Sequence, residues 1–113
     1  MGKRDDKIAQ YIENAKKLKL DLPADLISKV TVGLGPSIYK KDSETVSCSQ
    51  SSELETVKKN YLQKKLGLPS DDASFDAAIK KVCEAMGSSN RNKYRALFYA
   101  LLCKEFGKES VYA

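Results

Sequence analysis

Apolar residues recur at helical spacing in the first third of the chain. Between Lys3 and Leu18 the spacing of apolar positions predicts an amphipathic helix with one stripe facing the core. That stripe comprises Ile8, Tyr11, Ile12, Ala15 and Leu18. Pro23 is placed to be the first residue of a second helix, because proline is favoured at that position. The expected buried face of the second helix comprises Leu26, Ile27 and Val30.

The second helix is expected to end at a pair of glycines. Gly33 and Gly35 favour a helix end, and Pro36 prevents the helix from resuming. A connection to Ser51 follows, which is longer than most loops in compact domains. We expect it either to hold a short helical turn at residues 42–46 or to have a function of its own.

The third predicted helix has clear signals at both ends. Ser52 and Glu55 have the spacing of a capping box, and Gly67 followed by Leu68 predicts a Schellman-type stop. The inner face of this helix is predicted to hold Leu54, Val57, Tyr61, Leu62 and Leu66.

A fourth helix is expected after the acidic capping residues Asp71 and Asp72, and Gly87 should end it. Its apolar face comprises Phe75, Ala78, Ile79, Val82 and Met86. Each of these positions keeps the helical period.

The last helix differs from the others because it lacks a charged face. Ser88 or Ser89 is expected to cap it, and Gly107 to close it. The eight residues from Ala96 to Cys103 carry no charge, which predicts a helix surrounded by its own protein. The chain is therefore predicted to be all-α, a compact bundle of about five helices around this C-terminal helix. The residues expected to be buried in it are Leu97, Phe98, Leu101 and Leu102.

Length and composition fit one globular domain spanning residues 1–113. The chain is 42% hydrophobic and 31% charged, as is usual for proteins that fold around a core. Its longest apolar run is too short to cross a membrane, and its N-terminus has no signal-peptide core. Gly2 is not expected to be myristoylated, because the myristoylation motif has Ser or Thr at position 6 and this chain has Asp6. These features predict a cytoplasmic protein without a membrane partner.

The cysteine and histidine counts argue against several kinds of chemistry. Three cysteines at wide spacings, Cys48, Cys83 and Cys103, favour neither a disulfide framework nor a zinc site. The absence of histidine removes His-based nucleophile pairs and His-bound metals. We expect no metal, no cofactor and no enzymatic activity.

The lysines are spread along the chain and are not gathered on one face. The net charge is +5, and five Lys-Lys doublets occur at 16–17, 40–41, 58–59, 64–65 and 80–81. Most lie on the polar sides of different helices, where Glu55 with Lys59, Asp76 with Lys80, and Lys80 with Glu84 have ion-pair spacing. A nucleic-acid partner is therefore not favoured, since a binding face gathers its cations.

The basic start of the last helix is the best sequence candidate for a site. Cations are disfavoured there by the helix dipole unless an anion is near. A candidate anion site at this place comprises Ser89, Asn90, Arg91, Lys93 and Arg95. Two alternatives stay open: the cations pair with Asp71, Asp72, Glu84 or the chain terminus, or the turn and last helix form a DNA-binding helix-turn-helix. Ser88 stands where such a turn usually has an apolar residue.

Three segments of the chain resemble a family of small bacterial proteins described as a domain of unknown function. They are KVTVGLGPSIY (29–39), SELETVKKNYLQKKLGL (52–68) and SNRNKYRALFYALLCKEFGKESVY (89–112). The resemblance implies a compact helical protein of bacterial origin and brings no activity, cofactor or catalytic residue.

Two functional hypotheses follow. The first is a non-enzymatic module that binds a protein partner or a small anion, with the 36–51 loop, the 89–95 turn and the C-terminal tail as contact surfaces. The second is a weak nucleic-acid-binding protein that uses the basic turn and the start of the last helix.

Overall fold

The computed structural model describes residues 2–20, 22–40, 44–48, 50–69, 71–87 and 93–112, with the backbone alone at residues 36 and 37. The described part of the chain is helical and contains no strand, which confirms the all-α prediction. Its elements are α1 (Lys3–Lys17), α2 (Ala24–Leu34), η1 (Gly35–Tyr39), α4 (Ser51–Thr56), η2 (Val57–Lys65), α5 (Asp72–Met86), α6 (Arg95–Glu105) and η3 (Glu109–Tyr112). No helix among the described residues has the length and apolar character needed to cross a membrane.

Helices α1 and α2 lie close to their predicted positions. Tyr11 and Ala15 of α1 are buried, while Ile8, Ile12 and Leu18 are partly buried. In α2 the predicted residues Leu26, Ile27 and Val30 are all buried. Pro23 is the residue before the helix and not its first residue. Gly33 lies inside the helix, and Gly35, with φ of 64°, ends it.

The connection after α2 contains a short helix that the sequence did not predict. It begins with the 3₁₀ helix η1, in which Ile38 is buried. The predicted helical turn at 42–46 falls partly on residues outside the description. The Glu44 amide donates to the Lys40 carbonyl at 2.8 Å, as in a helical turn, and Thr45 then forms an isolated antiparallel bridge with Tyr94.

The third predicted helix consists of two segments of different pitch. It begins as α4, and from Val57 it continues as η2, a π-helix. In an α-helix of 3.6 residues per turn, Val57 and Leu66 would face opposite ways, because nine residues make about two and a half turns. The wider i→i+5 turn brings nine residues close to two full turns. Val57, Tyr61 and Leu66 are therefore all buried on one face.

The predicted capping box at the start of this helix does not form. The helix begins at Ser51, and its N-cap residue Gln50 makes no side-chain cap bond. Glu55 accepts a hydrogen bond from Lys58 at 3.2 Å instead of reaching back to Ser52. The predicted stop is confirmed, because Gly67 has φ of 68° and the Leu68 amide donates to the Leu62 carbonyl at 3.0 Å.

Helix α5 has the cap, the end and the buried face that the sequence predicted. The Asp71 side chain accepts a hydrogen bond from the Ser74 amide at 3.2 Å, and Gly87, with φ of 95°, ends the helix. The predicted apolar face is buried: Phe75, Ala78, Ile79, Val82 and Met86.

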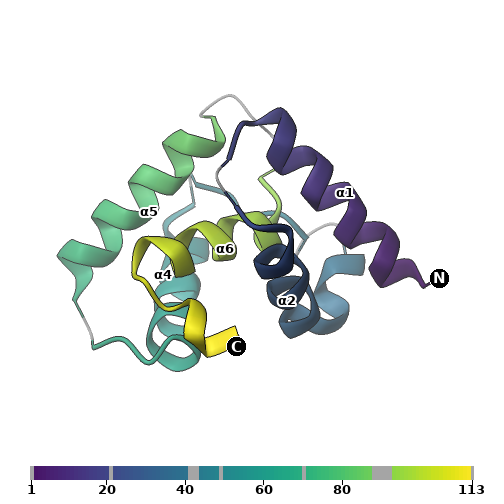
Figure 1. The fold of residues 1–113 in the computed structure, drawn as a ribbon. Coiled ribbons are helices and arrows are strands. Elements are labelled where there is room, and N and C mark those ends of the chain that lie inside the picture. Colours follow the sequence, from purple (N-terminus) through teal and green to yellow (C-terminus); the bar gives the residue numbers. More distant parts are fainter. Residues whose placement is uncertain are drawn as a thin grey trace.

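Helix α6 crosses the middle of the molecule and packs against α1, α2 and α5 (Figure 1). Leu97, Phe98 and Leu102 are buried, as predicted, whereas Leu101 is only partly buried. The helix begins at Arg95, with Tyr94 as its N-cap residue, and therefore later than a cap at Ser88 or Ser89 implies. Ser88 and Ser89 themselves lie outside the described residues.

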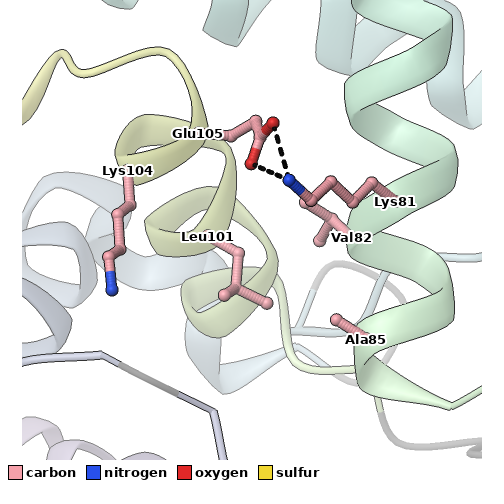
Figure 2. Close-up of a pocket in the computed structure, with 6 residues that line it drawn as sticks. All are labelled: Lys81, Val82, Ala85, Leu101, Lys104 and Glu105. Carbon is pink, nitrogen blue, oxygen red and sulfur yellow. Dashed lines mark hydrogen bonds and ion pairs between the residues drawn. The ribbon is translucent and has the colours of Figure 1, made fainter.

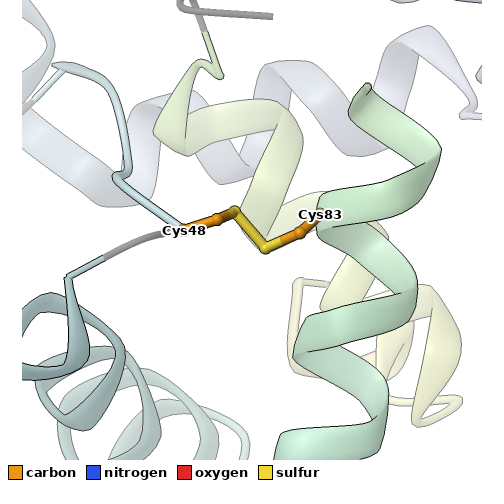
Figure 3. Close-up of a disulfide and its surroundings, with 2 residues drawn as sticks. All are labelled: Cys48 and Cys83. Carbon is orange, nitrogen blue, oxygen red and sulfur yellow. A yellow bond between two sulfur atoms is a disulfide. The ribbon is translucent and has the colours of Figure 1, made fainter. Parts of the chain in front are cut away.

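The prediction that the cysteines form no disulfide was wrong. Cys48 and Cys83 are joined by a disulfide between the 44–48 segment and α5 (Figure 3). An odd count and wide spacing do not exclude a pair, because the fold brings distant segments together and leaves the third cysteine, Cys103, buried as a free thiol.

Candidate functional site

The residues of the predicted anion site are only partly visible in the structure. Ser89, Asn90 and Arg91 lie outside the described residues. Lys93 and Arg95 are buried, with 8% and 9% of their surfaces exposed. The anion site therefore stays a prediction. It assumed that the last helix begins near Ser89, whereas α6 begins at Arg95.

Arg95 is engaged with groups from three parts of the chain. Its guanidinium forms an ion pair with Glu53 of α4 and donates to the Tyr99 hydroxyl at 2.9 Å. It also donates to the Thr45 carbonyl at 3.4 Å. Glu53 supplies a negative charge beside the first turn of α6, which accounts for a cation at a helix start. The sequence suggested internal pairing but named other acids, since nothing local connects Glu53 to Arg95.

A cluster of tyrosines continues this network along α6. Tyr61 of η2 stacks on Tyr99 with ring centroids 3.9 Å apart, and its hydroxyl donates to the Tyr99 carbonyl at 2.9 Å. The Tyr112 hydroxyl donates to that of Tyr61 at 2.9 Å. These contacts hold η2, α6 and η3 together, and we assign the cluster a structural role.

Burial in this region changes the proton affinity of several groups. It raises the pKa of the Cys103 thiol from 9.0 to about 11 and that of Tyr112 to about 12. Burial also raises the pKa of Tyr61. The folded protein thus keeps protons that the unfolded chain releases at alkaline pH.

We expect stability to fall between about pH 9 and pH 11. Because the folded pKa values are raised, this stabilisation is complete below the unfolded pKa values and is lost as the pH rises through the folded ones. Urea unfolding at pH 7 and pH 10.5 measures the loss. A free energy of unfolding that is equal or higher at pH 10.5 would show that these groups are not protected by folding.

A pocket of about 280 Å³ lies between α5 and α6 (Figure 2). The wall from α5 comprises Lys81, Val82 and Ala85, and the wall from α6 comprises Leu101, Lys104 and Glu105. Its interior is mainly apolar, and Leu101 and Ala85 extend into the space between the two helices. This position explains why Leu101 is less buried than its neighbours in α6.

An ion pair spans the two walls of the pocket. The Lys81 amine lies 3.2 Å from the Glu105 carboxylate, and the two side chains are 70% and 35% exposed. Lys104 extends from the same turn of α6, with its amine apart from this pair (Figure 2). The lining thus includes two lysines, Lys81 and Lys104, and one glutamate, Glu105.

Among the described residues there is no group of three or more Cys, Asp or Glu side chains placed to hold a metal ion.

The acids Glu55 and Asp76 surround the Lys58 amine at 3.2 and 2.6 Å. Their predicted partners were Lys59 and Lys80, but both acids pair with Lys58 of η2 instead.

Sequence reasoning missed the pocket because some of its residues were interpreted as solvated helix surface and others as core. Lys81 belongs to a Lys-Lys doublet interpreted as solvated, and Leu101 was assigned to the core. The one available signal was the i, i+3 and i+4 spacing of Leu101, Lys104 and Glu105 on a helix that is otherwise apolar.

Comparison with known protein families assigns the chain to a family. The sequence model of a family described as "Protein of unknown function (DUF2853)" matches residues 10–110. A search of curated proteins found no match.

Proposed function

Because the chain belongs to the DUF2853 family, whose description assigns no activity, we propose its function from the geometry of the pocket. We propose a non-enzymatic module that binds a small aliphatic carboxylate between α5 and α6. The observation that carries the proposal is an apolar pocket with an accessible lysine at its edge. A cytoplasmic location is part of the same proposal.

The size and lining of the pocket support a small amphipathic ligand. Its volume of 280 Å³ is just below the roughly 300–1,000 Å³ usual for ligand pockets. Val82, Ala85 and Leu101 offer an apolar surface to a short alkyl chain. Removing that chain from water supplies the non-directional part of the affinity.

Lys81 supports an anionic head group. An ammonium group has three N–H donors, and Glu105 occupies at most two of them through its two oxygens. A ligand carboxylate can therefore accept a hydrogen bond from Lys81 without displacing Glu105. The Lys81 side chain is 70% exposed, so its amine is accessible to the head group of a ligand.

The proposal is tested by calorimetric titration with hexanoate. We expect binding in the millimolar range, with hexylammonium at least tenfold weaker because its charge is repelled by the lysines. A tenfold ratio corresponds to about 1.4 kcal/mol. Equal binding of the two ligands would overturn the assignment of a carboxylate site.

The variant Lys81→Gln should weaken hexanoate binding about fivefold or more. The matched control is Lys80→Gln, which makes the same change of charge one residue away on α5, outside the pocket lining. The two variants separate a local contact from a general effect of net charge. Equal weakening in both would contradict a direct contact with Lys81.

The alternative, nucleic-acid binding through the basic turn, remains a prediction. Its residue Arg91 lies outside the described residues, and Lys93 and Arg95 are buried. Binding of labelled DNA or RNA at about 50 mM salt, lost steeply as the salt concentration rises, would support it.

A further inference from the structure

The segment 44–48, which we call the strap, connects the two helices that form the pocket. It lies across the start of α6 and reaches α5 through its last residue (Figure 3). Glu44, at its beginning, accepts hydrogen bonds from Lys7 at 2.7 Å and from the Tyr11 hydroxyl at 2.6 Å. The strap is thereby also anchored to α1.

The connection to α6 consists of hydrogen bonds. The Val46 amide donates to the Lys93 carbonyl at 2.8 Å, and Thr45 forms a bridge with Tyr94. The Thr45 carbonyl accepts a hydrogen bond from Arg95, the first residue of α6. These bonds contain no sulfur, so a change of redox state leaves them in place.

The connection to α5 includes the Cys48–Cys83 disulfide, whose Cα atoms are 6.2 Å apart. Cys83 follows directly after the pocket residues Lys81 and Val82. The strap therefore holds α5 covalently beside its pocket residues, and it holds α6 by hydrogen bonds at the start of the helix, before the pocket residues Leu101 and Glu105. Both cysteines are only partly buried, so a reductant has access to them.

We propose that the Cys48–Cys83 disulfide is a redox switch for the pocket between α5 and α6. This inference rests on the proposed function of that pocket. With the disulfide intact, the strap holds the two walls in the geometry that receives a ligand. After reduction, α5 loses its covalent connection to the strap, the walls move more freely, and binding must order them again at a cost in affinity.

The chemical step is a thiol–disulfide exchange with a dithiol. A thiolate of the dithiol attacks one sulfur of the pair, breaks the S–S bond and forms a mixed disulfide. The second thiol of the reductant resolves this intermediate. Two electrons and two protons pass to Cys48 and Cys83, which become thiols, and the dithiol becomes a disulfide.

The proposed cytoplasmic location supports a reversible bond. In the cytosol, disulfides are rare, and those that occur are usually transient and catalytic or redox-sensing. The third cysteine, Cys103, is buried and its pKa is raised, so it does not compete as an attacking thiolate.

The test compares the full chain in its oxidised form and after reduction with dithiothreitol. Hexanoate binding is measured by calorimetry, and the amide shifts of Leu101 and Glu105 report on α6, the wall that contains no disulfide cysteine. We expect binding at least threefold weaker after reduction, together with shift changes at both amides. The variant Cys48→Ser should behave as the reduced form, and dithiothreitol should not affect it.

Each outcome is informative. Unchanged amides at Leu101 and Glu105, or equal affinity in the two redox states, overturn the switch even when hexanoate binds. Shifted amides without hexanoate binding in either state overturn the proposed ligand and support the coupling between strap and pocket. Loss of the helical circular dichroism signal on reduction also overturns the switch, because binding would then be lost by unfolding and not by a local change.

Discussion

Reduction of the Cys48–Cys83 disulfide is expected to lower the free energy of unfolding by about 4 kcal/mol. The bond closes a loop with a sequence separation of 35. The loop-closure relation assigns about 4 kcal/mol to a bond of that span, because the oxidised unfolded chain has fewer conformations. Domains are usually stable by about 5–15 kcal/mol, so the reduced chain should still fold.

Urea unfolding with and without dithiothreitol measures this difference. The double variant Cys48→Ser with Cys83→Ser serves as the control, because it should match the reduced protein and be insensitive to dithiothreitol. A loss below about 1 kcal/mol would mean that the bond does not constrain the unfolded chain as the loop length implies. Ellman's reagent gives an independent check, since the folded oxidised protein should show no reactive thiol and the unfolded one a single thiol from Cys103.

The variant Arg95→Met is expected to lower the free energy of unfolding by about 3 kcal/mol. Removing one partner of a buried ion pair typically costs about 3–5 kcal/mol because the other charge stays buried. We expect the lower end of this range of destabilisation, because the Glu53 side chain is 25% exposed and is partly hydrated when Arg95 is absent. The variant also removes donors to Tyr99 and to the Thr45 carbonyl.

Arg4→Met is the matched control for this variant. Arg4 lies exposed near the start of α1, and its replacement should change the free energy of unfolding by no more than about 0.5 kcal/mol. Adding Glu53→Met to Arg95→Met should recover part of the loss, since no unpaired charge remains. Equal effects of Arg95→Met and Arg4→Met would show that the buried pair contributes nothing to stability.

The sequence predicted those parts of the fold that depend on local periodicity. The buried faces of α2 and α5 follow from helical spacing, and the uncharged run in α6 correctly identified the central helix. The sequence failed where distant residues decide the local structure. The start of α6 at Arg95 depends on Glu53 and on the strap, and neither is close to it in the chain.

The capping box, the π segment and the disulfide show the same limit. Ser52 and Glu55 have capping-box spacing, but Glu55 is drawn to Lys58. The π turn of η2 places Leu66 on the same buried face as Val57. It therefore reflects the packing of these side chains against the core and not the intrinsic helix propensity of the residues. Cysteine spacing likewise cannot show that Cys48 and Cys83 are brought together.

The pocket was the hardest feature to predict. It lies between α5 and α6, and its character depends on how these two helices are placed side by side. Lys81 can be recognised as a pocket residue only once the fold shows Glu105 and Leu101 opposite it.

The central claim, that the pocket between α5 and α6 binds a small carboxylate, is tested most directly by a crystal structure of the oxidised protein soaked with hexanoate. The account predicts a carboxylate within hydrogen-bond distance of the Lys81 amine, about 2.7–3.2 Å, and an alkyl chain against Leu101 and Val82. An empty pocket at a hexanoate concentration that saturates binding in solution, or hexanoate bound elsewhere on the chain, would contradict it.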